Sequence, residues 1–308
     1  MIQIPEIINE KVPITFDNGI ELYIKREDKT HPKVSGNKFR KLKYNLQEAK
    51  AKGYPKIITF GGAYSNHISA TAAAGQIASI PTIGVIRGDE LRSKISENPT
   101  LRYAQSCGME FDFVSRTDFR QKHTNEFKAY LKEKFGDFYY VPEGGTNSFA
   151  VKGCEEILIP EDNMFNFITT AVGTGGTISG LINSSQENQK ILGFPALNGR
   201  FLEEEIKKMT TKHNWKLIHS YNLGGYAKIN DEFIHFLNDF YDKTNIPLDP
   251  IYTGKMIFGI FNLIEKQFFP KNSKILAIHT GGLQGIFGIN QKLKKQNKEI
   301  LHYENKID

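Results

Sequence analysis

The chain has 308 residues, with 40 basic against 34 acidic side chains and a formal net charge of +6 at pH 7. This excess is too small and too dispersed for a nucleic-acid-binding protein, and no apolar run is long enough to span a membrane. The N-terminal MIQIPEIINEK has neither a basic leader nor an apolar core, so no signal peptide and a cytoplasmic location are expected.

Short apolar strands alternate with helix-like segments along the chain. Helical spacing of apolar residues predicts a helix over 37–52, which Gly53 and Pro55 would end. The predicted strands are residues 56–60, 81–86, 109–114, 166–172 and 274–279. This alternation indicates an α/β fold with parallel-rich sheets flanked by helices.

The two cysteines, Cys107 and Cys154, lack the spacing of metal ligands or of a disulfide framework. Two reduced thiols and no metal site are therefore expected.

In such folds, ligands bind where loops leave the carboxyl ends of strands. One such loop, GTGGT, follows the strand predicted at 166–172, and its glycines can turn successive N–H groups toward one phosphate. A tight structural turn is the alternative. A dinucleotide fingerprint would need glycine where Ile178 stands, so a nucleotide-dependent oxidoreductase is disfavoured. The loop residues are Gly173, Thr174, Gly175, Gly176 and Thr177.

The segment SGNKFRKL places Lys38 at the expected start of a helix, beside Arg40 and Lys41. Positive neighbours and partial burial both lower the pKa of an amine and leave it nucleophilic. Taken alone, such a lysine is more often a surface residue.

A third loop, GGAYSNH, precedes an alanine-rich helical segment. Ser65, Asn66 and the N–H groups of that helix could hold a carboxylate. The alternatives are a plain helix cap for Ser65 or Asn66 and a structural role for His67.

Six motifs in order resemble one family over nearly the whole chain. They are KREDKTHPKVSGNKFRKL, GGAYSNH, PEGGTN, AVGTGGTISGL, LDPIYTGKM and HTGGLQGIFG. The family is that of 1-aminocyclopropane-1-carboxylate (ACC) deaminase and D-cysteine desulfhydrase. It belongs to the fold-type II enzymes that use pyridoxal 5′-phosphate (PLP), in the tryptophan synthase β superfamily.

The resemblance implies roles for individual residues. Lys38 would bind PLP covalently and move protons, while Lys41 and the GTGGT loop would bind the phosphate. Ser65, Asn66 and His67 would hold the carboxylate of a small amino-acid substrate, with Asn66 also near the cofactor ring.

Two tyrosines and a threonine complete the implied site. Tyr226 and Tyr252 match active-site tyrosines that face the substrate, although core aromatic residues are the alternative. Thr253 falls where the family places the partner of the pyridine nitrogen.

The resemblance implies ammonia release by one of two reactions. ACC deaminases carry glutamate at the position of Thr253, whereas the desulfhydrase branch carries threonine. We therefore expect β-elimination from D-cysteine, giving pyruvate, sulfide and ammonia, ahead of the conversion of ACC to 2-oxobutanoate and ammonia. A PLP-binding protein without turnover is the remaining alternative.

The same resemblance implies two domains and a homodimer. Residues 1–39 and 146–308 would form a large PLP-binding domain, and residues 40–145 a small inserted domain. Ser35 and Tyr64 depart from the family pattern, since glycine and glutamine are usual at these positions, and Tyr64 would reshape the pocket.

Overall fold

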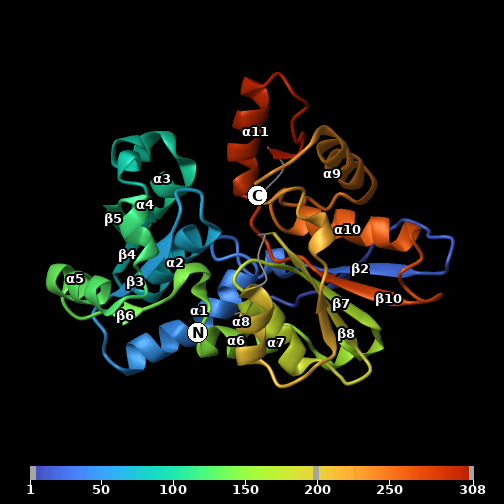
Figure 1. The fold of residues 1–308 in the computed structure, drawn as a ribbon, viewed down its shortest axis with the longest axis horizontal. Coiled ribbons are helices and arrows are strands. Elements are labelled where there is room, and N and C mark those ends of the chain that lie inside the picture. Colours follow the sequence, from blue (N-terminus) through green and yellow to red (C-terminus); the bar gives the residue numbers. More distant parts are fainter. Residues whose placement is uncertain (1–4, 197–200, 226, 305–308) are drawn as a thin grey trace.

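The computed structural model describes residues 5–196, 201–225 and 227–304. Its strands form one sheet of six strands and one of four. In Figure 1, the four-stranded sheet and its helices lie to the left and the six-stranded sheet to the right. The α/β class with parallel-rich sheets is therefore confirmed.

The six-stranded sheet joins the two ends of the chain. Its strands are Asn9–Lys11 (β1), Glu21–Lys25 (β2), Phe167–Val172 (β7), Lys190–Pro195 (β8), Trp215–Leu217 (β9) and Lys274–Ile278 (β10). The order is β1–β2–β10–β7–β8–β9, with β1 antiparallel to β2 and the other pairs parallel. The blue β2 and red β10 consequently lie side by side in Figure 1.

Helices cover both faces of this sheet because successive strand residues point to opposite sides. Phe167 and Ala171 pack with one group of helices, and Ile168 and Val172 with the other. The first group is Asp231–Thr244 (α9), Thr253–Glu265 (α10) and Gly285–Lys295 (α11). The second group is Ser148–Glu155 (α6), Gly176–Ser184 (α7) and Phe201–Met209 (α8).

The four-stranded sheet is parallel throughout and has the order β5–β4–β3–β6, formed by Glu110–Val114, Thr82–Arg87, Ile57–Gly61 and Tyr139–Tyr140. One apolar cluster joins it to Asn37–Ala51 (α1), Asn66–Ala78 (α2) and Pro99–Ser106 (α3). A second cluster joins it to Arg116–Arg120 (α4) and Asn125–Phe135 (α5). Short 3-10 helices lie at Glu27–Lys29, Asp89–Glu97, Glu143–Gly145, Pro160–Met164 and His219–Tyr221.

The five predicted strands and the predicted helix at 37–52 are present, each shifted by no more than one residue at either end. Cys107 and Cys154 are both buried and free. Within the described ranges, no helix has the length and apolar character needed to cross a membrane. The four-stranded sheet lies inside the segment predicted as a small domain, whose exact boundaries stay a prediction.

Candidate active site

A cavity of about 1210 Å³ lies where the carboxyl ends of both sheets meet. Segments that follow β3, β7 and β10 line it, as expected for a ligand site in parallel sheets. Gly176 and Thr253 are buried next to lining residues, and Tyr226 lies outside the described residues. The predicted site residues in the lining are Lys38, Lys41, Ser65, Asn66, His67, Gly173, Thr174, Gly175, Thr177 and Tyr252.

Lys38 is the second residue of α1, and its half-buried side chain lines the cavity. Desolvation, followed by the nearby charge of Lys41, lowers the pKa of Lys38 to about 7. The amine donates to Asn37 Oδ1 at 3.0 Å, and Asn37 Nδ2 donates to Thr177 Oγ1 at 2.9 Å. Asn37 therefore ties the nucleophilic amine to the start of α7.

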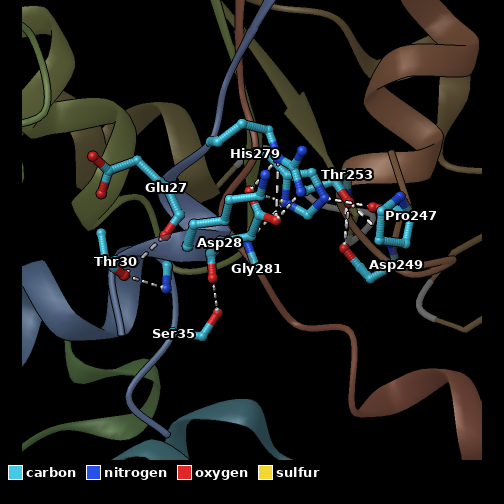
Figure 2. Close-up of polar contacts among 12 residues, drawn as sticks. Glu27, Asp28, Thr30, Ser35, Pro247, Asp249, Thr253, His279 and Gly281 are labelled. Atoms are coloured by element: carbon cyan, nitrogen blue, oxygen red, sulfur yellow. Dashed lines mark hydrogen bonds and ion pairs between the residues drawn. The ribbon is translucent and has the colours of Figure 1, made fainter. Parts of the chain in front are cut away.

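The loop before Lys38 is held against the loop after β10. Gly36 has a φ of +65°, and a Cβ there would lie 2.0 Å from the carbonyl oxygen of Thr280, so only glycine is accommodated. The N–H of Gly36 donates to Thr30 Oγ1, and Ser35 Oγ donates to the carbonyl oxygen of Asp28, as Figure 2 shows for the labelled Ser35 and Asp28. The hydroxyl of Ser35, which stands where the family usually has glycine, thus helps to hold this loop in place.

The lowered pKa of Lys38 predicts how the cofactor-free protein reacts with PLP at different pH values. Only the neutral amine attacks an aldehyde, so the attachment rate should rise about tenfold from pH 6 to pH 8 and then level off. Stopped-flow absorbance measures this rate, and the reaction of PLP with N-acetyl-lysine corrects for titration of the cofactor. A rate that keeps rising steeply from pH 8 to pH 9.5 would contradict the pKa shift.

Lys41 lies beside the GTGGT loop, and together they have the features that an anion site requires. The Lys41 ammonium donates to the carbonyl oxygen of Gly144 at 2.9 Å and to Thr146 Oγ1 at 3.0 Å, both neutral acceptors. It forms no ion pair with an acidic residue in the described part of the chain, and burial lowers its pKa to about 8. Gly175, with a φ of +86°, turns the loop into the start of α7, whose first N–H groups have no intrahelical acceptor.

These features meet the requirements of PLP. A phosphate would supply the missing counter-charge for Lys41, and its oxygens could accept from the N–H groups at the start of α7. The aldehyde needs a neutral amine, which Lys38 supplies near pH 7. The residues present therefore suit the cofactor that the sequence predicts.

The start of α2 forms the opposite wall. Ser65 is the N-cap of α2, where its Oγ accepts from the N–H of Ile68 at 3.4 Å, and it also lines the cavity. The cap uses the oxygen only as an acceptor, so the hydroxyl hydrogen can still be donated to a ligand. A capping role and a ligand-binding role are compatible at this residue.

His67 is buried and neutral. Burial, together with the charges of Lys38 and Lys41, lowers its pKa well below the ordinary value. Thr59 Oγ1 donates to the carbonyl oxygen of Val141, so it must accept at 2.7 Å from Nε2–H of His67. Nδ1 is then an acceptor, buried and without a partner among the described residues.

Thr253 is hydrogen-bonded to a carboxylate, that of Asp249, for which the sequence motifs imply no role. Asp249 is buried and accepts from the hydroxyl of Thr253 at 2.8 Å, and from the N–H groups of Ile251, Tyr252 and Thr253. Figure 2 shows Thr253 pointing toward Asp249. Asp249 therefore caps α10 and fixes the position of Tyr252, whose ring lies against Gly173.

The loop that leads to Tyr226 is held by Lys255. Its amine donates to the carbonyl oxygens of Asn222 and Gly225, each at 2.8 Å, and burial lowers its pKa to about 8. Neither Lys255, Asn37 nor Asp249 was predicted to act at the site. The sequence offers one signal for them, since all three stand inside the SGNK and LDPIYTGK motifs.

Known proteins are related to this chain in sequence and in fold. The chain is 32% identical to a Pyrococcus horikoshii protein named "Putative 1-aminocyclopropane-1-carboxylate deaminase", over 94% of each chain. It is also 32% identical to the Arabidopsis thaliana "Bifunctional D-cysteine desulfhydrase/1-aminocyclopropane-1-carboxylate deaminase, mitochondrial", over 88% of this chain and 74% of that protein. A solved structure described as an "ACC deaminase homologue" matches with a TM-score of 0.80 and 29% identity, covering 95% of this chain and 94% of that one.

A sequence profile of the family described as "Pyridoxal-phosphate dependent enzyme" matches residues 12–281. That range includes the described segments that line the cavity up to Gly281. The family resemblance and the PLP cofactor predicted from the motifs are both confirmed. The chain belongs to the family of pyridoxal-phosphate dependent enzymes.

Proposed function

We propose that this enzyme releases ammonia from a small amino acid by β-elimination, as a D-cysteine desulfhydrase does. The observation that carries the proposal is that the amine of Lys38 and the start of α2 face one cavity. The first suits covalent attachment and proton transfer, and the second suits a carboxylate. D-Cysteine has an amine that can react on the Lys38 side of the cavity and a carboxylate that can bind at the start of α2. It also has a thiol on Cβ that can leave.

The substrate carboxylate would bind at the start of α2. The N–H groups of the first turn have no intrahelical acceptors, and they lie at the positive end of the helix dipole. The hydroxyl of Ser65 adds a donor, and the amide of Asn66 stands beside Gly282 of the opposite loop. With its carboxylate bound there, the rest of the substrate would lie in the cavity that Lys38 lines.

Lys38 would take the proton from Cα of the substrate. When bound, PLP withdraws electrons from Cα and eases the loss of this proton and of a Cβ substituent. A pKa of about 7 lets Lys38 accept the proton and later return it. Overall, D-cysteine and water give pyruvate, sulfide and ammonia; the Cβ–S bond breaks and sulfur leaves with the electron pair.

The conversion of ACC to 2-oxobutanoate and ammonia is the second candidate. ACC has no proton on Cα, so its ring must be opened by another group, and Tyr252 stands at the cavity wall. Two relatives also carry this activity in their names. The neutral Thr253, in the place of the glutamate of ACC deaminases, favours elimination from D-cysteine.

Product assays of the PLP-loaded protein decide between these candidates. We expect sulfide, pyruvate and ammonia in equal amounts from D-cysteine, and much less product from L-cysteine as the matched control. Release of 2-oxobutanoate from ACC, with no sulfide from D-cysteine, would transfer the assignment to the second candidate. A protein that binds PLP but frees no ammonia from any amino acid would overturn the proposed function.

A further inference from the structure

The cavity lining holds an excess of positive charge. Its lysine, arginine and acidic residues are Lys33, Lys38, Lys41, Arg87, Glu143 and Glu205. The lining also includes His67 and His123, and burial lowers the pKa of each, so they add no charge at pH 7. Three cationic side chains, together with the amine of Lys38, which is partly neutral near pH 7, therefore face two acidic ones.

Neither acidic residue neutralises a cation of the lining, because each is paired with a lysine outside it. Glu143 lies 3.2 Å from the amine of Lys122. Glu205 lies 2.6 Å from the amine of Lys208. The positive charge of the lining is therefore available to anionic ligands.

The cofactor and one substrate carboxylate use only part of this charge. Lys41 would hold the phosphate, Lys38 would be taken up by its bond to PLP, and the start of α2 suits the α-carboxylate. Lys33 and Arg87 are left, and neither forms an ion pair with an acidic residue of the described chain.

Arg87 stands beside the loop that would hold the α-carboxylate. It ends β4, and because Gly61 of β3 pairs with Ile86, Arg87 lies next to Gly62 across the sheet. Its guanidinium nitrogen is 3.8 Å from where a Cβ on Gly62 would lie. The side chain of Arg87 is exposed, and its guanidinium packs over the ring of Phe119, 5.9 Å from its centre.

We propose that Arg87 binds a second anionic group of the substrate. The preferred substrate is then a small amino acid that carries a second carboxylate, or a comparable anionic group, in addition to its α-carboxylate and to the group that leaves from Cβ. The planar guanidinium suits such a group because it can donate two parallel hydrogen bonds. This inference rests on the proposed function and names the substrate class for the same site.

Binding of aspartate and asparagine to the PLP-loaded protein tests the inference without turnover. The two are nearly equal in size, differ in charge, and lack a good leaving group on Cβ. By calorimetry, with both enantiomers, we expect aspartate to bind about tenfold more tightly than asparagine. In Arg87→Met the two affinities should agree within about twofold, and added salt should shrink the difference in the wild type.

Two variants are controls. Arg92→Met removes an arginine that packs over Phe113 outside the cavity and should leave the aspartate preference unchanged. Lys33→Met removes the other unpaired cation of the lining, and loss of the preference only in this variant would overturn the role of Arg87. Equal binding of aspartate and asparagine to the wild type would overturn the inference alone. A protein that binds neither these nor D-cysteine would count against the proposed function itself.

Discussion

Lys38→Ala is expected to reduce ammonia release from D-cysteine by about 10³-fold or more and to abolish the visible absorption band of covalently bound PLP. The amine is both the point of attachment and the proposed base. The fold should persist, because folding lowers the pKa of Lys38 and so disfavours its charged form. Activity assays measure the loss of ammonia release, and absorption spectra measure the loss of the band. Urea denaturation of the cofactor-free variant measures whether the fold persists.

Lys255→Met is the matched control for that variant. Lys255 is also a buried lysine with a lowered pKa, but it does not line the cavity. This variant should keep the absorption band. After borohydride reduction, mass spectrometry should still find the cofactor attached to the peptide that contains Lys38. A band that survives in Lys38→Ala, with the label on another lysine, would show that the attachment site is misassigned.

Asp249→Ala is expected to lower the free energy of unfolding of the cofactor-free protein by about 3 to 5 kcal/mol. The variant would leave three N–H groups and the hydroxyl of Thr253 without their acceptor in a buried place. It would also lower the pKa of Lys38 further, because the Asp249 carboxylate raises that pKa. The pH at which PLP attachment reaches half its maximal rate should therefore fall.

Asp231→Ala provides the comparison on the surface. Asp231 also stands at the start of a helix, but it is exposed and forms an ion pair with the exposed Lys298, so a loss below about 1 kcal/mol is expected. Thr253→Val removes one of the four hydrogen bonds to the carboxylate and also the acceptor of the Asp249 N–H, and its cost should fall between the two. If Asp249→Ala were no more costly than Asp231→Ala, the carboxylate would not be holding the start of α10.

The sequence predicted the central strands of both sheets because their side chains are apolar on both faces. It did not predict β2 or β8, which have five and six residues. It also did not predict β1, β6 or β9, which have two or three residues each and too little pattern to read. The glycine loops were also predictable, since φ values such as +86° at Gly175 restrict the residue type. The predicted roles of Lys38, Ser65 and Tyr252 stay predictions, although the structure brings these residues to one cavity.

Contacts between distant segments were beyond what the sequence could give. The bond from Asn37 to Thr177 joins residues 140 positions apart, and nothing in either motif names the other. In the sequence, Arg87 is an ordinary residue at the end of a strand. Only the pairing of β3 with β4 shows that it lies beside Gly62. Asp249 reads as part of a turn before proline, and only its buried hydrogen bonds reveal a structural role.

The position of β10 has a consequence for how the protein is made. β10 lies between β2 and β7, so the six-stranded sheet cannot close until residue 278 has left the ribosome. The four-stranded sheet uses only residues 57–140 and can form while synthesis continues. Gly36 likewise meets Thr280 only once residue 280 has been made, long after the loop that holds Lys38. The nascent chain therefore acquires its cofactor site only after residue 280 has been translated.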